Sequence, residues 1–212
     1  MGQGVRMSVQ IHIPYTKEVN DQASFALNFD NALENVWCDA LIDWFERNGD
    51  ARTVEANRET RKDVQKWLPQ ESDLWVHLQN AKRDMLKNYL YRYPSVYRGK
   101  KKLRMPENKI QRTDPFGGGF HNFHSEVSHW ENCARALVWT IYLNDMPSNE
   151  GETEFLFDKI RIQPKKGKGV VWPAAWMFQH RGNPVHTHSK YIATGWYWYP
   201  EETGYYGNTK SS

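Results

Sequence analysis

Three residues in the C-terminal half carry side chains that could hold a metal ion together. His124 and Glu126 are two positions apart, and in an extended strand residues i and i+2 project from the same face. His180 comes much later, across several expected strands, where a folded sheet could return it to the same point. Two histidines and one carboxylate form the facial triad that suits non-haem Fe(II) and leaves three coordination positions open. A His-x-Glu pair alone is common by chance, so this assignment needs further support.

Lys190 provides that support, because it follows His180 by ten residues, about one strand-length. A lysine ammonium at this position could pair with the far carboxylate of a dicarboxylate bound to the metal. Between Glu126 and His180, residues 136–144 form an apolar run that is typical of a buried strand and carries Tyr142.

Two amphipathic helices are expected upstream of these residues. The first has apolar residues with helical spacing and a C-terminal stop at Asn48-Gly49. The second is expected over residues 72–92, with Ser72 as its N-cap. The expected buried positions are Leu33, Val36, Trp37, Ala40, Leu41, Trp44 and Phe45 in the first helix, and Leu74, Leu78, Ala81, Met85 and Tyr89 in the second.

Short apolar runs follow from about residue 103, separated by Gly, Pro, Asn and Asp, which is typical of a β-sandwich or barrel. The runs are 136–143, 154–157, 160–163, 169–172 and 190–199, and a further short strand is expected at 8–13. The fold class is therefore α+β, with N-terminal helices that buttress a β-core. We expect one domain over residues 1–212, with helical support over roughly 28–95, the β-core over roughly 103–200 and a polar tail over 201–212.

The composition predicts a soluble protein in a reducing compartment. The net charge of +3 is too small to indicate nucleic-acid binding, and the basic stretch 98–104 lacks interleaved aromatic residues, so a solvated loop is expected there. Cys38 and Cys133 are too few for a disulfide framework. No signal-peptide pattern and no membrane-spanning run is present. We expect a cytoplasmic location, which is that of the host cell if the protein is viral.

Six short motifs resemble, in order, those of the prolyl 4-hydroxylase-like 2-oxoglutarate- and Fe(II)-dependent oxygenases. The resemblance covers about residues 105–200, and residues 116–126 look most like the small hydroxylase-like proteins of marine phages. The motifs are His124-x-Glu126, Tyr142-Leu-Asn-Asp145, Gly151-Glu-Thr153-x-Phe155, Pro164-x-x-Gly167, His180-x-Gly-x-Pro-Val185 and Lys190-Tyr191 with Trp196.

This resemblance implies a double-stranded β-helix, a relative of the jelly roll, with iron held by His124, Glu126 and His180. It also implies a dioxygenase that uses Fe(II), 2-oxoglutarate and O2, with ascorbate as a further candidate cofactor. The enzyme would hydroxylate a C–H bond while 2-oxoglutarate becomes succinate and CO2. The leading substrate is a prolyl residue in a peptide or protein. A free amino acid, another protein residue or a nucleobase stays open, because fold and cofactor do not fix the substrate.

The resemblance also assigns roles to five further residues. Lys190 would pair with the distal carboxylate of 2-oxoglutarate, Tyr142 would hydrogen-bond to that carboxylate, and Thr153 would line the pocket. Trp196 is about six strand residues, or ~20 Å, from Lys190, so we place it nearer the iron or in the core. Arg135 matches an arginine that meets the substrate, although a surface charge is an equal alternative.

The sequence departs from the family pattern at two positions. Glu126 stands where the family more often has Asp, and the extra methylene shifts the carboxylate. A tyrosine that commonly precedes the first histidine by about nine residues is absent, and Phe116 in that region cannot donate the hydrogen bond that the tyrosine would.

Two other classes of function can be weighed against the oxygenase. A zinc or other metal hydrolase would explain the three ligands but not Lys190 together with Tyr142. A non-catalytic jelly-roll binding module, for sugars or for a partner protein, would explain the many Trp and Tyr residues, but most of these fall in expected strands and are more simply core.

Overall fold

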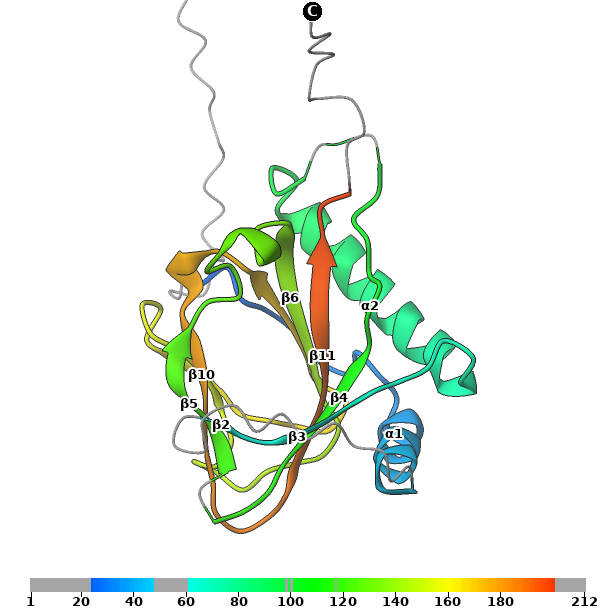
Figure 1. Ribbon diagram of the computed structural model, residues 1–212, viewed down its shortest axis with the longest axis vertical. Coiled ribbons are helices and arrows are strands. Elements are labelled where there is room, and N and C mark those ends of the chain that lie inside the picture. The colour runs from blue at the N-terminus through cyan, green and yellow to red at the C-terminus, as the bar shows by residue number, and fades with distance from the viewer. Residues whose placement is uncertain (1–23, 48–60, 98, 100, 117, 201–212) are drawn as a thin grey trace, which may run out of the picture.

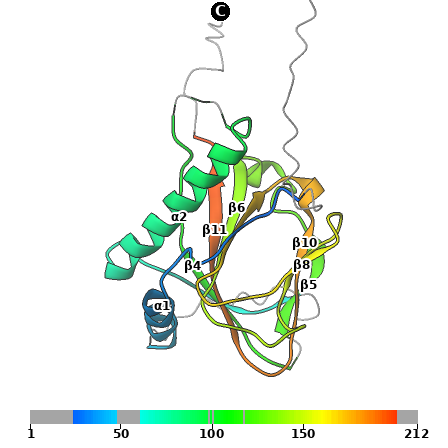
Figure 2. The same cartoon turned by 180° about the vertical axis from the view of Figure 1, so that it is seen from behind.

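The computed structural model describes residues 24–47, 61–97, 99, 101–116 and 118–200. In this part of the chain two antiparallel sheets face each other, and two helices lie outside one of them (Figures 1 and 2). This arrangement confirms the α+β class and the double-stranded β-helix core. The strand expected at 8–13, the helix stop at Asn48-Gly49 and the polar tail 201–212 lie outside the described residues.

The larger sheet has six strands and carries the helices on its outer face. In spatial order its strands are β1 (Leu27–Phe29), β9 (Gly169–Pro173), β6 (Arg135–Tyr142), β11 (Lys190–Trp198), β4 (Lys109–Thr113) and β3 (Val64–Trp67). The smaller sheet has five strands. In spatial order these are β2 (Arg61–Lys62), β5 (Gly118–His124), β10 (His180–Val185), β7 (Thr153–Phe155) and β8 (Ile160–Ile162).

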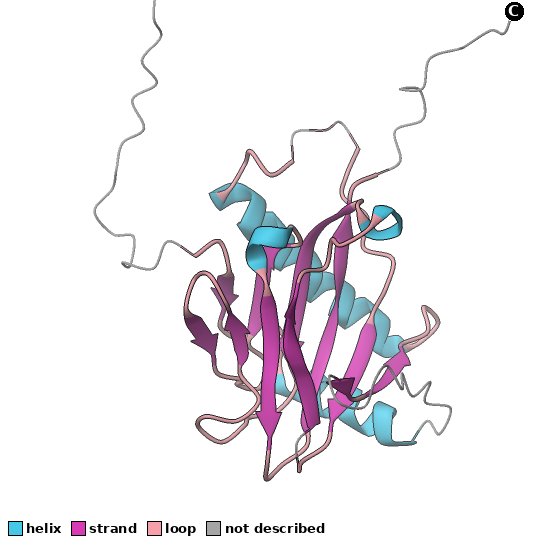
Figure 3. Ribbon diagram, turned by 60° about the vertical axis from the view of Figure 1, so that its left-hand side comes forward, coloured by secondary structure: helices cyan, strands magenta, loops and turns pink. Residues whose placement is uncertain are grey.

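Helices α1 (Asn35–Arg47) and α2 (Asp73–Arg92) lie where the apolar spacing predicted them (Figure 3). The Ser72 hydroxyl accepts a hydrogen bond from the Leu74 amide, which confirms the predicted N-cap of α2. The stripe predicted for α1 was wrong at two positions. Leu33 is buried but precedes the helix, and Val36 is 58% exposed because it lies on the outer face.

Helix α2 is fixed against the outer face of the larger sheet by specific contacts. The Tyr197 hydroxyl of β11 donates a hydrogen bond to the Lys82 carbonyl of α2 over 2.8 Å. A Cβ at Gly169 of β9 would overlap Met85 Sδ of α2, so any larger residue there would force the Met85 side chain to shift. The helix therefore supports the strands that carry the functional side chains on their inner face.

An apolar cluster fills part of the space between the sheets. Its buried members are Ala26, Val138, Tyr142, Phe155, Ile162, Val170, Trp172 and Ala174. The remaining space between the sheets is a cavity, described below.

Several strands were not among the predicted apolar runs. Strands β1, β2 and β3 come from the region expected to be helical support, so that region also contributes to both sheets. Strands β4, β5 and β10 are rich in Gly, Pro or polar residues, which hides them from an apolar pattern. Among the described residues no helix is both long enough and apolar enough to cross a membrane.

Candidate metal centre and co-substrate cavity

The two candidate histidine ligands are brought together by strand pairing within the smaller sheet. His124 is the last residue of β5, His180 is the first residue of β10, and the two are direct partners in this antiparallel pair. Directly opposite residues place their side chains on the same face of a sheet. The two imidazole centroids are consequently 4.5 Å apart.

Each imidazole is fixed in a way that leaves Nε2 available to a metal ion. Nδ1 of His124 is 3.0 Å from the Asn122 carbonyl, and Nδ1 of His180 is 3.0 Å from the Phe178 carbonyl. Because a carbonyl only accepts, each Nδ1 carries the hydrogen and each Nε2 keeps its lone pair. Aromatic rings also support the imidazoles, since Phe120 stacks on His124 at 3.8 Å and Trp172 meets His180 edge-on at 4.9 Å.

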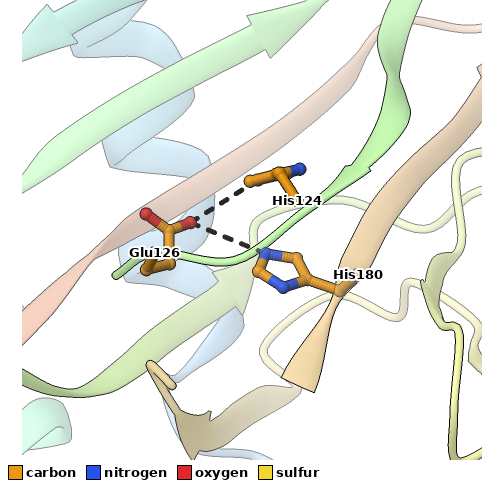
Figure 4. Close-up of side chains that lie close together, drawn as sticks. All are labelled: His124, Glu126 and His180. Carbon is orange, nitrogen blue, oxygen red and sulfur yellow. Dashed lines mark ion pairs between the residues drawn. The ribbon is translucent and has the colours of Figure 1, made fainter. Parts of the chain in front are cut away.

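Glu126 completes the cluster from a loop, and not from the strand as predicted. Strand β5 ends at His124, and Glu126 lies in the bend that follows. The carboxylate still converges on the histidines, because its Oε1 is 3.6 Å from Nε2 of His124 and 3.6 Å from Nε2 of His180 (Figure 4). Glu126 thus joins the cluster as predicted, but it does so from a bend and not from the regular strand that the prediction assumed.

Two side chains of the larger sheet hold the Glu126 carboxylate in this position. The Trp196 indole donates its N–H to Oε2 over 2.9 Å, and the Arg135 guanidinium donates to the same oxygen over 3.3 Å. Arg135 also donates to the Glu126 backbone carbonyl over 3.0 Å. Oxygen Oε2 is thus engaged by the protein while Oε1 faces the histidines. The loop carboxylate is positioned by contacts across the cavity, and Arg135 acts on it directly.

The charge states of the cluster suit a divalent cation. Burial would raise the pKa of the Glu126 carboxyl, but its interactions with His124 and His180 outweigh burial and hold that pKa well below its usual range. Burial lowers the pKa of His124, against the opposing effect of Glu126. An ionised carboxylate beside a neutral imidazole is the protonation state in which these groups bind metals.

The three donor atoms lie within 4.8 Å of one another, and no other group of three or more such ligands occurs in the described part of the chain. Two imidazole nitrogens and one carboxylate oxygen are a donor set that fits Fe(II), and three protein ligands leave further coordination positions open.

Lys190 lies at the start of β11 with its ammonium buried in the same cavity. Its Nζ donates to the Gly151 carbonyl over 2.7 Å, and a Cβ on Gly182 would come within 3.8 Å of it. Gly151 has a φ of +66°, which favours glycine, and a side chain there would crowd the lysine stem. Burial lowers the pKa of Lys190 to about 8, although the carboxylates of Glu152 and Asp63 oppose this shift.

Tyr142, which the resemblance assigned to the distal carboxylate of 2-oxoglutarate, contacts Thr153 through its hydroxyl. Its hydroxyl is fully buried and donates to Thr153 Oγ1 over 2.7 Å. Thr153 lines the cavity, while Tyr142 lies behind it in the apolar cluster. The Tyr142 hydroxyl therefore orients the threonine hydroxyl, and a hydrogen bond from Tyr142 to 2-oxoglutarate stays a prediction.

The cavity between the sheets has a volume of about 710 Å³ and contains both the metal cluster and Lys190. This size is within the range of small-molecule sites and leaves room for a substrate group beside a five-carbon dicarboxylate. Several further residues of the cavity were not predicted, and they alternate along β3, β4, β6 and β11 with a period of two. They are Gln65, Trp67, Lys109, Gln111, Thr113, Thr140, Ile192 and Thr194. This alternation of side chains is the sequence signal that could have identified these cavity residues.

Phe116 does not reach the cavity. Its side chain is 88% exposed and its φ is 63°, so the turn after β4 directs it into solvent. Phe116 therefore does not take the place of the tyrosine that the family commonly has in this region.

Residues 109–198 match the sequence profile of the 2OG-Fe(II) oxygenase superfamily, and this segment runs from β4 to β11 through all three candidate ligands. This segment belongs to the superfamily. The protein is a 2OG-Fe(II) oxygenase, and its fold is prolyl 4-hydroxylase-like. Fe(II) and 2-oxoglutarate are the cofactor and co-substrate typical of the superfamily, which agrees with the donor set.

Solved structures with the same fold include several prolyl hydroxylases at low sequence identity. The viral collagen prolyl hydroxylase vCPH from Paramecium Bursaria Chlorella virus-1, solved with 2OG, is 22% identical with a TM-score of 0.63, over 82% of this chain and 96% of that chain. The Pseudomonas putida prolyl-4-hydroxylase is 17% identical with a TM-score of 0.67, over 84% of this chain and 95% of that chain.

A third similar structure was solved with a peptide. This Trichoplax adhaerens prolyl hydroxylase, in complex with a hypoxia inducible factor oxygen degradation domain peptide fragment, is 13% identical with a TM-score of 0.66. The match covers 83% of this chain and 84% of that chain. A search among proteins of curated function finds no match.

Proposed function

We propose that this oxygenase hydroxylates prolyl residues in a peptide or protein substrate. The observation that carries the oxygenase chemistry is the placement of a His-Glu-His cluster and a buried lysine in one cavity. The choice of a prolyl substrate is supported by the shared fold of the three prolyl hydroxylases above, one of which was solved with a peptide.

Each residue of the site has a distinct task in this proposal. His124, Glu126 and His180 hold the iron, which, when bound, supplies the oxygen activation that hydroxylates the substrate while 2-oxoglutarate becomes succinate and CO2. Lys190 binds the distal carboxylate of 2-oxoglutarate, and Thr153 lines that pocket. The protein therefore binds the co-substrate at its two ends and fixes its orientation.

Tyr142, Arg135 and Trp196 act through other residues. Tyr142 orients the Thr153 hydroxyl, while Arg135 and Trp196 hold the Glu126 carboxylate. Arg135 was expected either to meet the substrate or to be a surface charge. It lines the cavity, and its hydrogen bonds are with Glu126. We therefore assign Arg135 as a positioning residue for the metal ligand.

The test is a substrate panel with Fe(II), 2-oxoglutarate, ascorbate and O2. Proline-containing peptides should stimulate succinate formation and gain the mass of one oxygen atom, and matched peptides with alanine in place of proline should do neither. If only free amino acids, nucleobases or proline-free peptides couple to succinate formation, the prolyl assignment is wrong while the oxygenase chemistry stands.

A further inference from the structure

Two exposed tryptophans lie close in the sequence to the candidate metal ligands. Trp130 follows Glu126 by four residues, and Trp176 precedes His180 by four residues. Each tryptophan is the first residue of a single 3-10 turn, and neither belongs to the cavity lining. The two residues are 80% and 65% exposed, although tryptophan is among the side chains that gain most from burial.

The backbone holds these two turns side by side. The Val127 amide donates to the Ala174 carbonyl over 3.1 Å, and the Ala174 amide donates to the Ala136 carbonyl over 3.1 Å. These bonds join the segment between Glu126 and β6 to the segment between β9 and His180. Both turns consequently lie at the end of the sandwich that carries the metal ligands (Figure 1).

A third turn adds apolar side chains at the same end. Leu156 and Phe157 follow Phe155, which pairs with His180 across the smaller sheet. The Leu156 amide also donates to the carbonyl of the residue before His180, over 2.9 Å. We call the exposed apolar side chains of the three turns the apolar rim, and its members are Trp130, Leu156, Phe157, Trp176 and Met177. Single exposed apolar residues are ordinary, but a group of them on adjoining turns is typical of a binding surface.

Solvent reaches the metal end of the cavity more than the co-substrate end. The side chains of His124 and Glu126 are 23% and 16% exposed, whereas Lys190 is buried and its ammonium donates to a backbone carbonyl. The reacting carbon of a substrate has to reach the metal ligands, so the residues on either side of it must leave the cavity past the turns at this end. The apolar rim therefore lies where a peptide substrate would pass.

Other residues hold the two tryptophan turns in place. Asn132 is buried, and its side-chain oxygen accepts hydrogen bonds from the Ser128 and His129 amides over 3.0 and 3.1 Å. In the second turn, Phe178 packs against the apolar cluster between the sheets, and its ring centroid is 5.9 Å from that of Phe25. Because these contacts anchor the turns, replacement of either exposed tryptophan by a polar residue should leave the fold intact.

We infer that the apolar rim binds apolar side chains that flank the hydroxylated proline of a peptide substrate, with Trp130 and Trp176 as specificity residues. This inference rests on the proposed function, because it adds to a prolyl substrate the neighbours that the enzyme selects. An indole offers a large, rigid contact area at a low cost in side-chain entropy. Aliphatic side chains that lie against the two indoles would be removed from water, whereas polar side chains would gain little there.

The experiment uses peptides with one proline in a background of glycine and serine, in which a single leucine replaces serine at each nearby position in turn. For the wild type, leucine at one or more positions should raise kcat/KM about tenfold over serine, which corresponds to about 1.4 kcal/mol. Trp130→Ser and Trp176→Ser should each reduce this preference, and the double variant should abolish it. Anisotropy of labelled peptides on the iron-free protein should give the same order of affinities without catalysis.

Phe116→Ser is the matched control, because it removes an equally exposed aromatic side chain from the other end of the sandwich. Phe116 follows β4 just beyond Thr113, the cross-strand partner of Lys190. This variant should keep the wild-type preference for leucine. Formation of the visible band of the Fe(II) and 2-oxoglutarate complex without O2 checks that the tryptophan variants still assemble the site, and thermal unfolding checks that they fold.

Hydroxylation of proline peptides with equal kcat/KM for leucine and serine at every position overturns the inference alone, as does a leucine preference that survives in the double variant. A concentration-dependent dimer that the two tryptophan substitutions dissociate, without any leucine preference, would assign the apolar rim to a second copy of this chain and also overturn it. If no proline-containing peptide is hydroxylated at all, the proposed function fails and the inference fails with it, so the two failures are distinguished.

Discussion

Replacing Lys190 with Met tests the step that separates a 2-oxoglutarate enzyme from any other protein with the same three ligands. Methionine keeps most of the apolar stem that packs beside Gly151 but deletes the ammonium group. Lys190 is only 6% exposed, so no solvent can replace its charge at the distal carboxylate. Removing one partner of a buried charged pair costs about 2–5 kcal/mol. The Kd of 2-oxoglutarate should therefore rise by about 30-fold or more, at about 1.4 kcal/mol per decade.

The assay is an anaerobic titration of the Fe(II)-loaded protein with 2-oxoglutarate, followed by the visible band of the complex. Iron affinity should be nearly unchanged in Lys190→Met, because Lys190 is not among the donor atoms of the cluster. Trp196→Phe is the matched control in the same cavity. It removes the hydrogen bond to Glu126 at the metal end, so it should affect 2-oxoglutarate affinity much less than Lys190→Met does.

A Lys190→Met variant that binds 2-oxoglutarate as tightly as the wild type would refute the co-substrate assignment, even if all three iron ligands were confirmed. A large loss of iron affinity in Lys190→Met would contradict the inference that Lys190 and the metal ligands act at different ends of the cavity. Rescue of binding by Lys190→Arg is not required, because a planar guanidinium presents its charge and donors in a different geometry from an ammonium.

Further predictions concern the same cavity. Alanine at His124, Glu126 or His180 should abolish 2-oxoglutarate decarboxylation while the melting temperature is kept, and near wild-type turnover in any one variant would exclude that residue as a ligand. Since burial lowers the pKa of Lys190 to about 8, the ammonium is lost as pH rises through that value. The Kd of 2-oxoglutarate should then rise by up to about tenfold per pH unit above about 8, and this dependence should vanish in Lys190→Met. Trp196→Phe should weaken Fe(II) retention in a chelator competition, and unchanged retention would show that the indole does not position Glu126.

Much of the chemistry could be predicted from the sequence because its residues occur in short, ordered motifs. His124, Glu126, His180 and Lys190 were all identified before their arrangement was known, and the structure places all four in one cavity. The Ser72 cap of α2 was predictable for a similar reason, since a capping residue acts on its immediate neighbours. Both the motifs and the helix cap depend on residues that are close together in the sequence, so they can be predicted from it.

Strands β5 and β10 could not be found in the same way. Their sequences contain glycine, asparagine and proline, and each is stabilised by its partner in the smaller sheet more than by intrinsic propensity. The pairing of His124 with His180 is a tertiary property that no local pattern encodes. The cavity-facing Lys109 was missed because β4 is too polar to be distinguished from a loop.

A glutamate at position 126 needs the two side chains that hold its carboxylate, Trp196 and Arg135. A carboxylate that lies beyond the end of β5 is not fixed by the regular backbone, and a glutamate has one more rotatable bond than an aspartate to immobilise. Trp196 and Arg135 supply that restraint from the opposite sheet, through hydrogen bonds to Oε2 that leave Oε1 directed at the histidines. Arg135 contacts the candidate metal ligand Glu126 directly, so its charge influences how strongly this carboxylate would donate to a cation. The Glu126 side chain thus links the histidines of the smaller sheet to Trp196 of the larger sheet. Trp196 lies in β11, the strand that begins with Lys190.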